Sequence, residues 1–404
     1  MRSRKQMTMD RNNRANRIRA KKNRSDTHRK VSLFNLAFFF GMILLADVIL
    51  IFNHGRLFSE NENRVLQQAP VMTATSLTSG KYMERAEDFI ADQFFARDEW
   101  IYSKFKIDKI LGRKESNGVY LGKNGYLLEA PAAAEKEKLD RTLSAIKSFA
   151  SAHSGLPQVL ALVPNALTVY PEAVSAGLPS HDQTEDLAYI GESLDSSITY
   201  VNLLDCLSEQ KQEQLYYKSD HHWTSLGARY AFEGMAETLG ITSGITWKVL
   251  TVADDFSGTM AASSGNFTAT DQVDLYIAQP EVDYYLEYSG DPVKYSSIYN
   301  SSALDSKNKY EVFFGGNYPK ITITTVNETG RKLLLIKDSY ANCLVQFLLP
   351  YYDQIIIIDP RYYSDDLETD LNSMHATDIL YLFGDDYYLE LQRHISKRSE
   401  ERRV

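Results

Sequence analysis

Residues 332–342 have the sequence KLLLIKDSYAN, an apolar strand pattern that turns polar at Lys337 and leads into a helical pattern over residues 341–349. A short apolar run bounded by turn residues is typical of a strand that is covered on both faces. Ser339 therefore falls at a strand-to-helix turn. In an α/β sheet this turn lies at the carboxyl edge, where ligand crevices form and a helix N-terminus can stabilise an oxyanion.

The same alternation of strands and helices begins near residue 136. Further strand patterns cover residues 158–163, 198–203, 354–358 and 378–383. Helical patterns between several of them include residues 136–153 and 225–239. Short buried strands that alternate with helices predict a parallel α/β sheet with both faces covered. We therefore expect one α/β domain over residues 136–395.

Two regions do not follow this alternation of strands and helices. Residues 245–330 are rich in Gly, Ser, Tyr and Thr, and we expect β-type insertions and loops there, over one end of the sheet. Ahead of the sheet, residues 81–111 have helical periodicity, and residues 117–129 predict a hairpin that turns at Asn124-Gly125. We group residues 54–135 as a juxtamembrane linker with a helical and hairpin subdomain.

The N-terminus carries an unusual charge. Residues 1–30 contain twelve Lys or Arg and two Asp, a net charge of +10, whereas the whole chain has a net charge of −9. Residues 31–53 follow as an apolar run that, at ~1.5 Å per residue, is long enough to cross a ~30 Å hydrocarbon layer. Because flanking positive charge stays in the cytoplasm, we expect a transmembrane helix at 31–53, a cytoplasmic tail at 1–30 and an extracytoplasmic remainder.

Two other interpretations of this end are weaker. A cleaved signal peptide has an apolar stretch of roughly 7–15 residues and small residues at its cleavage site, which the following FNHGRLFSENENR does not provide. A basic tail can bind nucleic acid, but its place directly before an apolar run favours a membrane instead. Asp47 lies inside the run, and we expect it near the outer interface or against a partner helix.

Residues 218–224, KSDHHWT, form the densest group of chemically active side chains. Asp220 and His222 are two positions apart, which places them on one side of an extended segment, so Asp220 can orient the His222 ring in a nucleophile–base–acid relay. A metal site is the second interpretation, but no partner motif such as HExxH supplies further ligands, and we expect no metal. The third is that both histidines are loop residues beside a packed Trp223.

Ser339 supports the relay, although a Ser at this position can also be a simple helix N-cap. Cys343 is a rival nucleophile, but it lies one turn inside the predicted helix, where packing is the commoner role. Cys206 and Cys343 are the two cysteines, and their spacing does not establish whether they pair.

These segments resemble the DHHW family, a group of bacterial membrane-anchored proteins related to the alginate O-acetyltransferases with an SGNH-hydrolase-like domain. The resemblance extends over most of residues 56–395. Besides SDHHWTSLGA and KDSYAN, it includes FSENENR (58–64), DQFFARDEW (92–100), NGVYLGKNGYL (117–127), PNALTVYPE (164–172) and IDPRYY (358–363). It implies an α/β fold: an SGNH-hydrolase-like parallel sheet flanked by helices, with β-rich insertions and one N-terminal transmembrane helix.

By position, the resemblance implies Ser339 as nucleophile, His222 as general base and Asp220 as the residue that orients the base. It places Arg361 near the site, and we expect Arg361 and Tyr340 to bind substrate. The candidates for oxyanion donors are Ser339 and, by composition, Gly315, Gly316 and Asn317.

The implied function is a membrane-anchored extracytoplasmic O-acetyltransferase that acts on an exopolysaccharide or cell-wall glycan through an acetyl-serine intermediate. No cofactor and no nucleic acid are expected, and a multi-spanning membrane O-acyltransferase is the expected acyl donor. Two alternatives stay open. One is a polysaccharide acetylesterase, in which water takes the acyl group, and the other is a non-catalytic glycan-binding or assembly factor.

Overall fold

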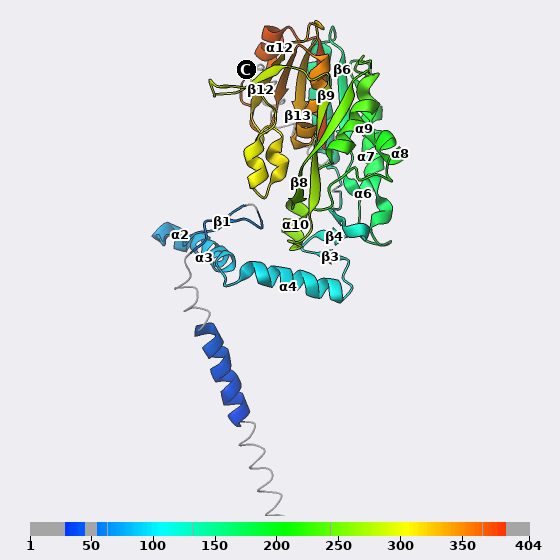
Figure 1. Cartoon of the computed structure of the whole chain (residues 1–404). Helices are drawn as coiled ribbons and strands as arrows, with labels where there is room; N and C mark the ends of the chain where they lie inside the picture. The colour runs from blue at the N-terminus through cyan, green and yellow to red at the C-terminus, as the bar shows by residue number, and fades with distance from the viewer. Residues whose placement is uncertain are drawn as a thin grey trace, which may run out of the picture. The chain divides into compact units, whose positions relative to one another are not determined.

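The computed structural model describes residues 29–44, 55–62, 64–131, 133–242, 244–365 and 367–384 (Figure 1). The chain divides into two compact units. The first contains the residues up to Ser59 together with Arg64–Glu99, and the second contains Glu60–Asn63 and the residues from Trp100 onward.

The second unit is built on an eight-stranded sheet with the order β11-β10-β12-β14-β13-β15-β6-β7. In chain order the strands are β6 (Gln158–Val163), β7 (Thr199–Asn202), β10 (Tyr284–Tyr288), β11 (Lys294–Tyr295), β12 (Lys320–Thr325), β13 (Lys332–Lys337), β14 (Gln354–Ile358) and β15 (Asp378–Gly384). Neighbours from β14 to β7 run parallel, whereas β12, β10 and β11 each run antiparallel to their neighbours. The sheet is therefore mixed.

The prediction of a parallel sheet is correct for β14 to β7 and wrong for the other edge. Part of the region 245–330 joins the sheet instead of only covering its end. The reason is visible in β12, whose residues alternate between buried and half-buried, the pattern of a strand with one covered face. It pairs with β14 from Lys320 opposite Ile358 to Thr324 opposite Gln354.

Both faces of the parallel part are covered by helices (Figure 1). One face packs against α5 (Lys136–Ala152), α7 (Gln183–Ser193) and α12 (Leu367–Met374). The other face packs against α6 (Ala166–Val169), α8 (Leu203–Glu209), α9 (Ser225–Ala236) and α11 (Val345–Leu348). In β13, Leu334 and Ile336 face the first layer while Leu333 and Leu335 face the second, which explains why the strand is apolar at its four central positions.

The remainder of the inserted region forms a long hairpin and short helical turns. Strands β8 (Thr246–Phe256) and β9 (Asp271–Gln279) pair antiparallel, with α10 (Thr259–Ser264) between them. The 3₁₀ turns η3 (Ser301–Asp305) and η4 (Lys309–Val312) follow β11. The predicted β character of residues 245–330 is confirmed.

The helical character predicted for residues 81–111 is confirmed, and the chain forms two helices there. They are α3 (Lys81–Asp92) and α4 (Arg97–Ile110), and Ala96 between them has a φ of 51°, which no helix accommodates. Before them lie the pair β1 (Phe58–Ser59) and β2 (Arg64–Val65) and the helix α2 (Ala74–Thr78).

The predicted hairpin is present in a three-stranded sheet of β3 (Glu115–Ser116), β4 (Val119–Leu121) and β5 (Leu127–Leu128). Its turn η1 (Lys123–Gly125) has positive φ at Asn124 (56°) and Gly125 (85°), as an Asn-Gly turn requires.

The expected membrane segment is only partly described. Residues 29–44 form a helix with exposed apolar side chains, and residues 45–53 lie outside the described ranges, as does the basic tail before residue 29. Within the described ranges, no helix combines the length and the apolar character that a membrane crossing needs.

The start of α9 gives a test of the packing. A Cβ added at Gly227 would lie 2.3 Å from the backbone oxygen of Leu215, so Gly227→Ala should destabilise the protein by about 1–3 kcal/mol, although Ala is the better helix former. Gly244→Ala is the matched control, because its Cβ meets nothing within 4 Å. Urea unfolding measures both variants, and an equally stable Gly227→Ala protein would contradict this packing.

Candidate active site

Ser339 follows β13 directly. Asp338 caps the turn, since its carboxylate accepts the Tyr340 N–H at 2.9 Å and the Gly384 N–H, at the end of β15, at 2.7 Å. Ser339 then begins the 3₁₀ turn η5 (Ser339–Cys343), which leads into the short α11. The predicted helix 341–349 is therefore a series of short turns, but the strand-to-turn position of Ser339 is as predicted.

The DHHW segment precedes α9. Tyr216 and Trp223 form an isolated antiparallel bridge, which draws the intervening residues into a tight loop. Thr224 caps α9 by accepting the Gly227 N–H at 3.2 Å. The loop is further held by the buried Asp271, whose carboxylate accepts the Ser219 N–H and hydroxyl at 2.7 and 2.6 Å.

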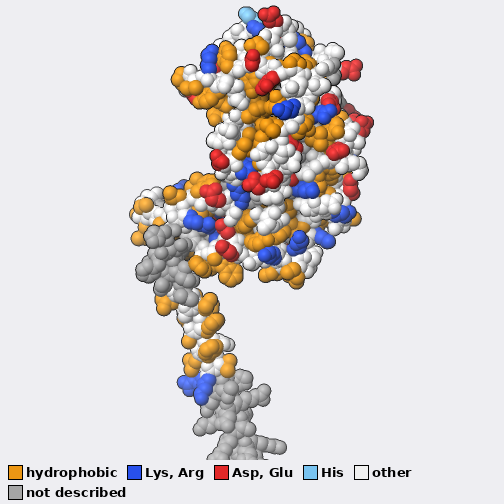
Figure 2. Space-filling model, in the orientation of Figure 1, with side chains coloured by type: hydrophobic (Ala, Val, Ile, Leu, Met, Phe, Trp, Pro, Cys, Tyr) orange, Lys and Arg blue, Asp and Glu red, His pale blue; other side chains and the backbone are white. Residues whose placement is uncertain are grey.

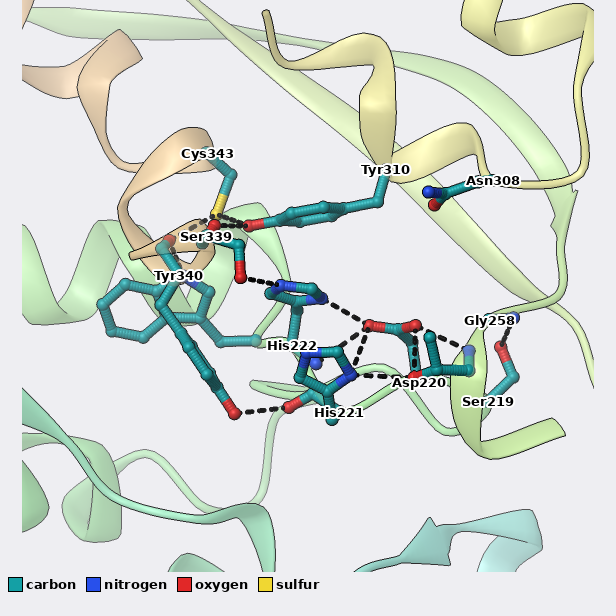
Figure 3. Close-up of polar contacts among 12 residues, drawn as sticks. Ser219, Asp220, His221, His222, Gly258, Asn308, Tyr310, Ser339, Tyr340 and Cys343 are labelled. Atoms are coloured by element: carbon teal, nitrogen blue, oxygen red, sulfur yellow. Dashed lines mark hydrogen bonds and ion pairs between the residues drawn. The ribbon is translucent and has the colours of Figure 1, made fainter. Parts of the chain in front are cut away.

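The fold brings these two segments together (Figure 3). His222 Nε2 lies 2.9 Å from Ser339 Oγ, across 117 residues of sequence. His222 Nδ1 lies 2.6 Å from Asp220 Oδ1, which also accepts the His222 backbone N–H at 3.0 Å. The three side chains thus form a continuous hydrogen-bonded chain with the connectivity of a nucleophile, a base and an orienting acid.

Asp220 is buried and kept ionised by its surroundings. Its second oxygen accepts the Thr259 N–H at 2.8 Å and the Thr259 hydroxyl at 3.0 Å, at the start of α10. Burial alone would raise the pKa of Asp220, but His221, His222 and these hydrogen bonds hold it well below its usual value. Burial and the adjacent His222 lower the pKa of His221 to about 4, so His221 is neutral near pH 7.

Gly258 allows this approach of α10 to Asp220. A Cβ at position 258 would lie 2.3 Å from the Cβ of Asp220. No side chain fits at that distance, and the Gly258 N–H also donates to Ser219 Oγ at 3.2 Å.

Aromatic side chains fix the His222 ring and the Ser339 backbone. The Tyr310 ring stacks on His222 with centroids 4.0 Å apart and an interplanar angle of 17°, and its hydroxyl donates to Ser339 O at 2.9 Å. Trp223 Nε1 donates to Tyr340 O at 2.8 Å, and the Tyr340 hydroxyl donates to His221 O at 2.8 Å. Sequence reasoning missed Tyr310 because it is one of many tyrosines in the inserted region, with no motif around it.

The predicted substrate-binding residues already have partners within the protein. Tyr340 is buried, and its hydroxyl bonds to His221 as described. The Arg361 guanidinium donates to both carboxylate oxygens of Asp359, at 2.9 and 2.6 Å. Asp359 also lies 3.4 Å from Lys337 Nζ, so Arg361 belongs to a buried charge cluster at the base of the nucleophile turn.

The predicted oxyanion residues differ in position. Among the described residues, no acceptor pairs with the Ser339 N–H or the Gly316 N–H. Asn317 is exposed, and its Oδ1 accepts from Asn342 Nδ2 at 3.2 Å, which connects it to the turn that begins at Ser339. Within the described chain its Nδ2 has no acceptor, so it keeps a donor for a ligand. Gly315 and Gly316 both have positive φ, 77° and 126°.

The cluster also has the composition of a metal site. Asp220, His221 and His222 each offer one ligand atom, and these atoms lie within 4.8 Å of one another. Several of them are already in short hydrogen bonds, including His221 Nδ1 to Thr259 Oγ1 at 2.7 Å. The relay accounts for the bond between His222 and Asp220, whereas a metal would have to displace both that bond and the bond between His221 and Thr259.

Cys343, the rival nucleophile, is fully buried behind Ser339. Burial raises the pKa of its thiol to about 12, and that of Cys206 to about 11, so neither is a thiolate near pH 7. Both cysteines are free thiols.

Comparisons with known proteins agree with this architecture. The family model described as DHHW protein matches residues 140–358. A probable alginate O-acetylase AlgJ of Pseudomonas syringae pv. tomato is 27% identical over 178 residues, which span 41% of this chain but only 44% of that protein.

Two solved structures share the fold. A DHHW family protein from Eubacterium siraeum superimposes with a TM-score of 0.60 at 23% identity, covering 70% of this chain and 96% of that one. Bacillus cereus PatB1, solved with a sulfonyl adduct, gives a TM-score of 0.57 at 19% identity, covering 67% and 95%.

Thiol titration tests the burial of Cys343. With a thiol-specific disulfide reagent and no reductant, we expect almost no reaction in the folded Cys206→Ser variant and one thiol after denaturation, because Cys343 is buried and protonated. The unaltered chain should give two thiols after denaturation. Rapid reaction of Cys343 in the folded variant would contradict the structure, and no thiol in the denatured unaltered chain would indicate a disulfide.

Proposed function

Because the chain belongs to the DHHW family, we propose that it is an O-acetyltransferase that modifies a polysaccharide outside the cytoplasm through Ser339, His222 and Asp220. The observation that carries the proposal is the unbroken hydrogen-bonded chain from Ser339 Oγ through His222 to Asp220. The 27% identity to a probable alginate O-acetylase supports acetyl transfer as the chemistry.

In the first half-reaction, Ser339 Oγ attacks the carbonyl carbon of an acetyl donor while His222 Nε2 takes the hydroxyl proton. Asp220 holds Nδ1 of the ring and stabilises the imidazolium, as its lowered pKa allows. The tetrahedral intermediate collapses, the leaving group takes the proton from His222, and Ser339 carries the acetyl ester.

In the second half-reaction, a sugar hydroxyl attacks the acetyl-serine and His222 again removes the proton. The sugar keeps the acetyl group, and Ser339 recovers its proton from His222. The Ser339 N–H, which is not paired within the described chain, is the first oxyanion donor, and Gly316 or Asn317 is the second. Tyr340 and Arg361 shape the site, and binding of substrate by either residue is part of the proposal.

The cellular setting is also proposed. Residues 31–53 anchor the chain in the cell membrane with a cytoplasmic N-terminus, and a multi-spanning membrane O-acyltransferase passes the acetyl group outward to Ser339. The apolar composition of residues 31–53 and the +10 charge before them support this topology.

Replacing Ser339 with Ala tests the proposal directly. In cells, we expect acetate on the surface polysaccharide to fall to the level of a deletion strain. With purified full chain, an activated acetyl ester and oligosaccharide, transfer should fall by about 10⁴-fold or more. Cys343→Ala in the same turn is the control and should retain most of the activity. Full transfer by Ser339→Ala would refute the serine mechanism.

The same assay separates the alternatives. Acetate release without transfer to added oligosaccharide would identify an esterase. Neither release nor transfer, with oligosaccharide binding intact in Ser339→Ala, would identify a binding or assembly factor.

Tyr310→Phe tests the positioning of the nucleophile. It keeps the stack on His222 but removes the bond to Ser339 O, so we expect transfer to fall by about 5- to 10-fold, the equivalent of one hydrogen bond. Tyr310→Leu, which also removes the stack, should lose more.

Tyr288→Phe is the matched control, because it removes a bond of the same length, 2.9 Å, to Phe314 O within the same inserted region. A Tyr310→Phe enzyme that works as well as Tyr288→Phe would show that the hydroxyl does not position Ser339.

A further inference from the structure

Helix α4 has two contrasting faces within the second unit. On the inner face, Phe105 and Asp108 are buried, and Ile101 lies against Gly265. On the outer face and just beyond the helix end, four large apolar side chains are exposed: Trp100 (62%), Ile107 (55%), Ile110 (83%) and Leu111 (66%). Their spacing places them along one side of the helix, so they form an apolar stripe, which Ser103 and Lys104 interrupt between Trp100 and Ile107.

This stripe lies in a positively charged segment of an acidic protein. Residues 100–114 contain five Lys or Arg and one Asp, a net charge of +4, within a chain of net charge −9. Lys104 and Arg113 pair with Asp108, at 2.8 and 3.3 Å. Lys109 and Lys114 have no acidic partner in the described chain. Figure 2 shows apolar and basic side chains intermixed over this part of the surface.

An exposed apolar stripe that contains Trp and is flanked by Lys is typical of a helix that lies in a membrane interface. The apolar side chains enter the boundary between headgroups and acyl chains, and the lysines interact with anionic headgroups. A single exposed apolar residue is ordinary, but several large ones on one side of a helix indicate a contact surface.

We infer that the outer face of α4, from Trp100 to Lys114, binds the surface of an anionic phospholipid bilayer. This inference rests on the proposed anchor at 31–53, which would keep α4 at high local concentration beside the membrane. We assign lipid to this surface because it combines exposed apolar side chains with lysines that have no acidic partner. A bilayer offers acyl chains to the apolar side chains and anionic headgroups to the lysines.

The contacts of α4 extend to the proposed catalytic acid. Lys104 Nζ donates to Asn117 Oδ1 at 3.0 Å, and Asn117 Nδ2 donates to the backbone oxygen of Ser263, near the end of α10, at 3.2 Å. The first residue of α10, Thr259, in turn donates to Asp220. Lys104 and Asn117 therefore connect α4 to α10, the element that supports Asp220.

Lipid quenching in the full chain tests this surface. We would label Ile107→Cys with an environment-sensitive fluorophore in the Cys206→Ser background, and reconstitute the protein into vesicles of phosphatidylcholine and phosphatidylglycerol, with or without brominated acyl chains. Val326→Cys, at a position 67% exposed on the same unit, is the matched control.

We expect brominated lipid to quench the label at position 107 by about twofold or more and to leave position 326 unchanged. Quenching at position 107 should weaken without phosphatidylglycerol and in the K109E/K114E variant.

Equal signals at positions 107 and 326 in protein that floats with the vesicles would overturn the α4 surface alone. A blue-shifted but unquenched label at 107 would also overturn it, because protein and not lipid would then cover the stripe. Failure of the chain to float with the vesicles would refute the anchor, and the inference with it.

Discussion

The site depends on one contact, the docking of the DHHW loop onto the turn after β13. Trp223 donates to Tyr340 O and Tyr340 donates back to His221 O, both at 2.8 Å, so two bonds of opposite direction join the same two segments. Trp223 is fully buried, and its bond therefore cannot be exchanged for one to water without loss. Between these bonds lie His222 and Ser339, whose 2.9 Å separation follows from the docking.

The inserted region, residues 245–330, supplies further contacts that hold the site residues in place. Thr259 donates a hydrogen bond to the second carboxylate oxygen of Asp220, and Asp271 accepts one from the neighbouring Ser219. The Tyr310 ring stacks on His222, and its hydroxyl donates to Ser339 O. Thr259, Asp271 and Tyr310 all belong to residues 245–330, which also extend the sheet with β10, β11 and β12. The insertion is therefore a structural part of the candidate site. A change that loosens it should affect the base and the nucleophile together.

The sequence predicts those features that have local patterns. Strands β6 and β14 match the predicted bounds, since each is apolar at every position after its first residue, as a strand buried on both faces requires. The turn at Ser339 follows from the change from an apolar strand pattern to polar residues at Lys337. The two-helix arrangement of α3 and α4 depends on the positive φ of Ala96, which no residue type there requires. Tyr310 and Thr259 reach the site only through tertiary packing, which has no periodic signal.

Mass spectrometry of the enzyme after brief exposure to an activated acetyl ester tests the central claim most directly. We expect one acetyl group on the peptide that contains Ser339, and about a 10³-fold slower acetylation in His222→Ala, because the base no longer takes the serine proton. Acetyl transfer to sugar with no acetyl group ever captured on Ser339, or with acetylation confined to another residue, would contradict the mechanism.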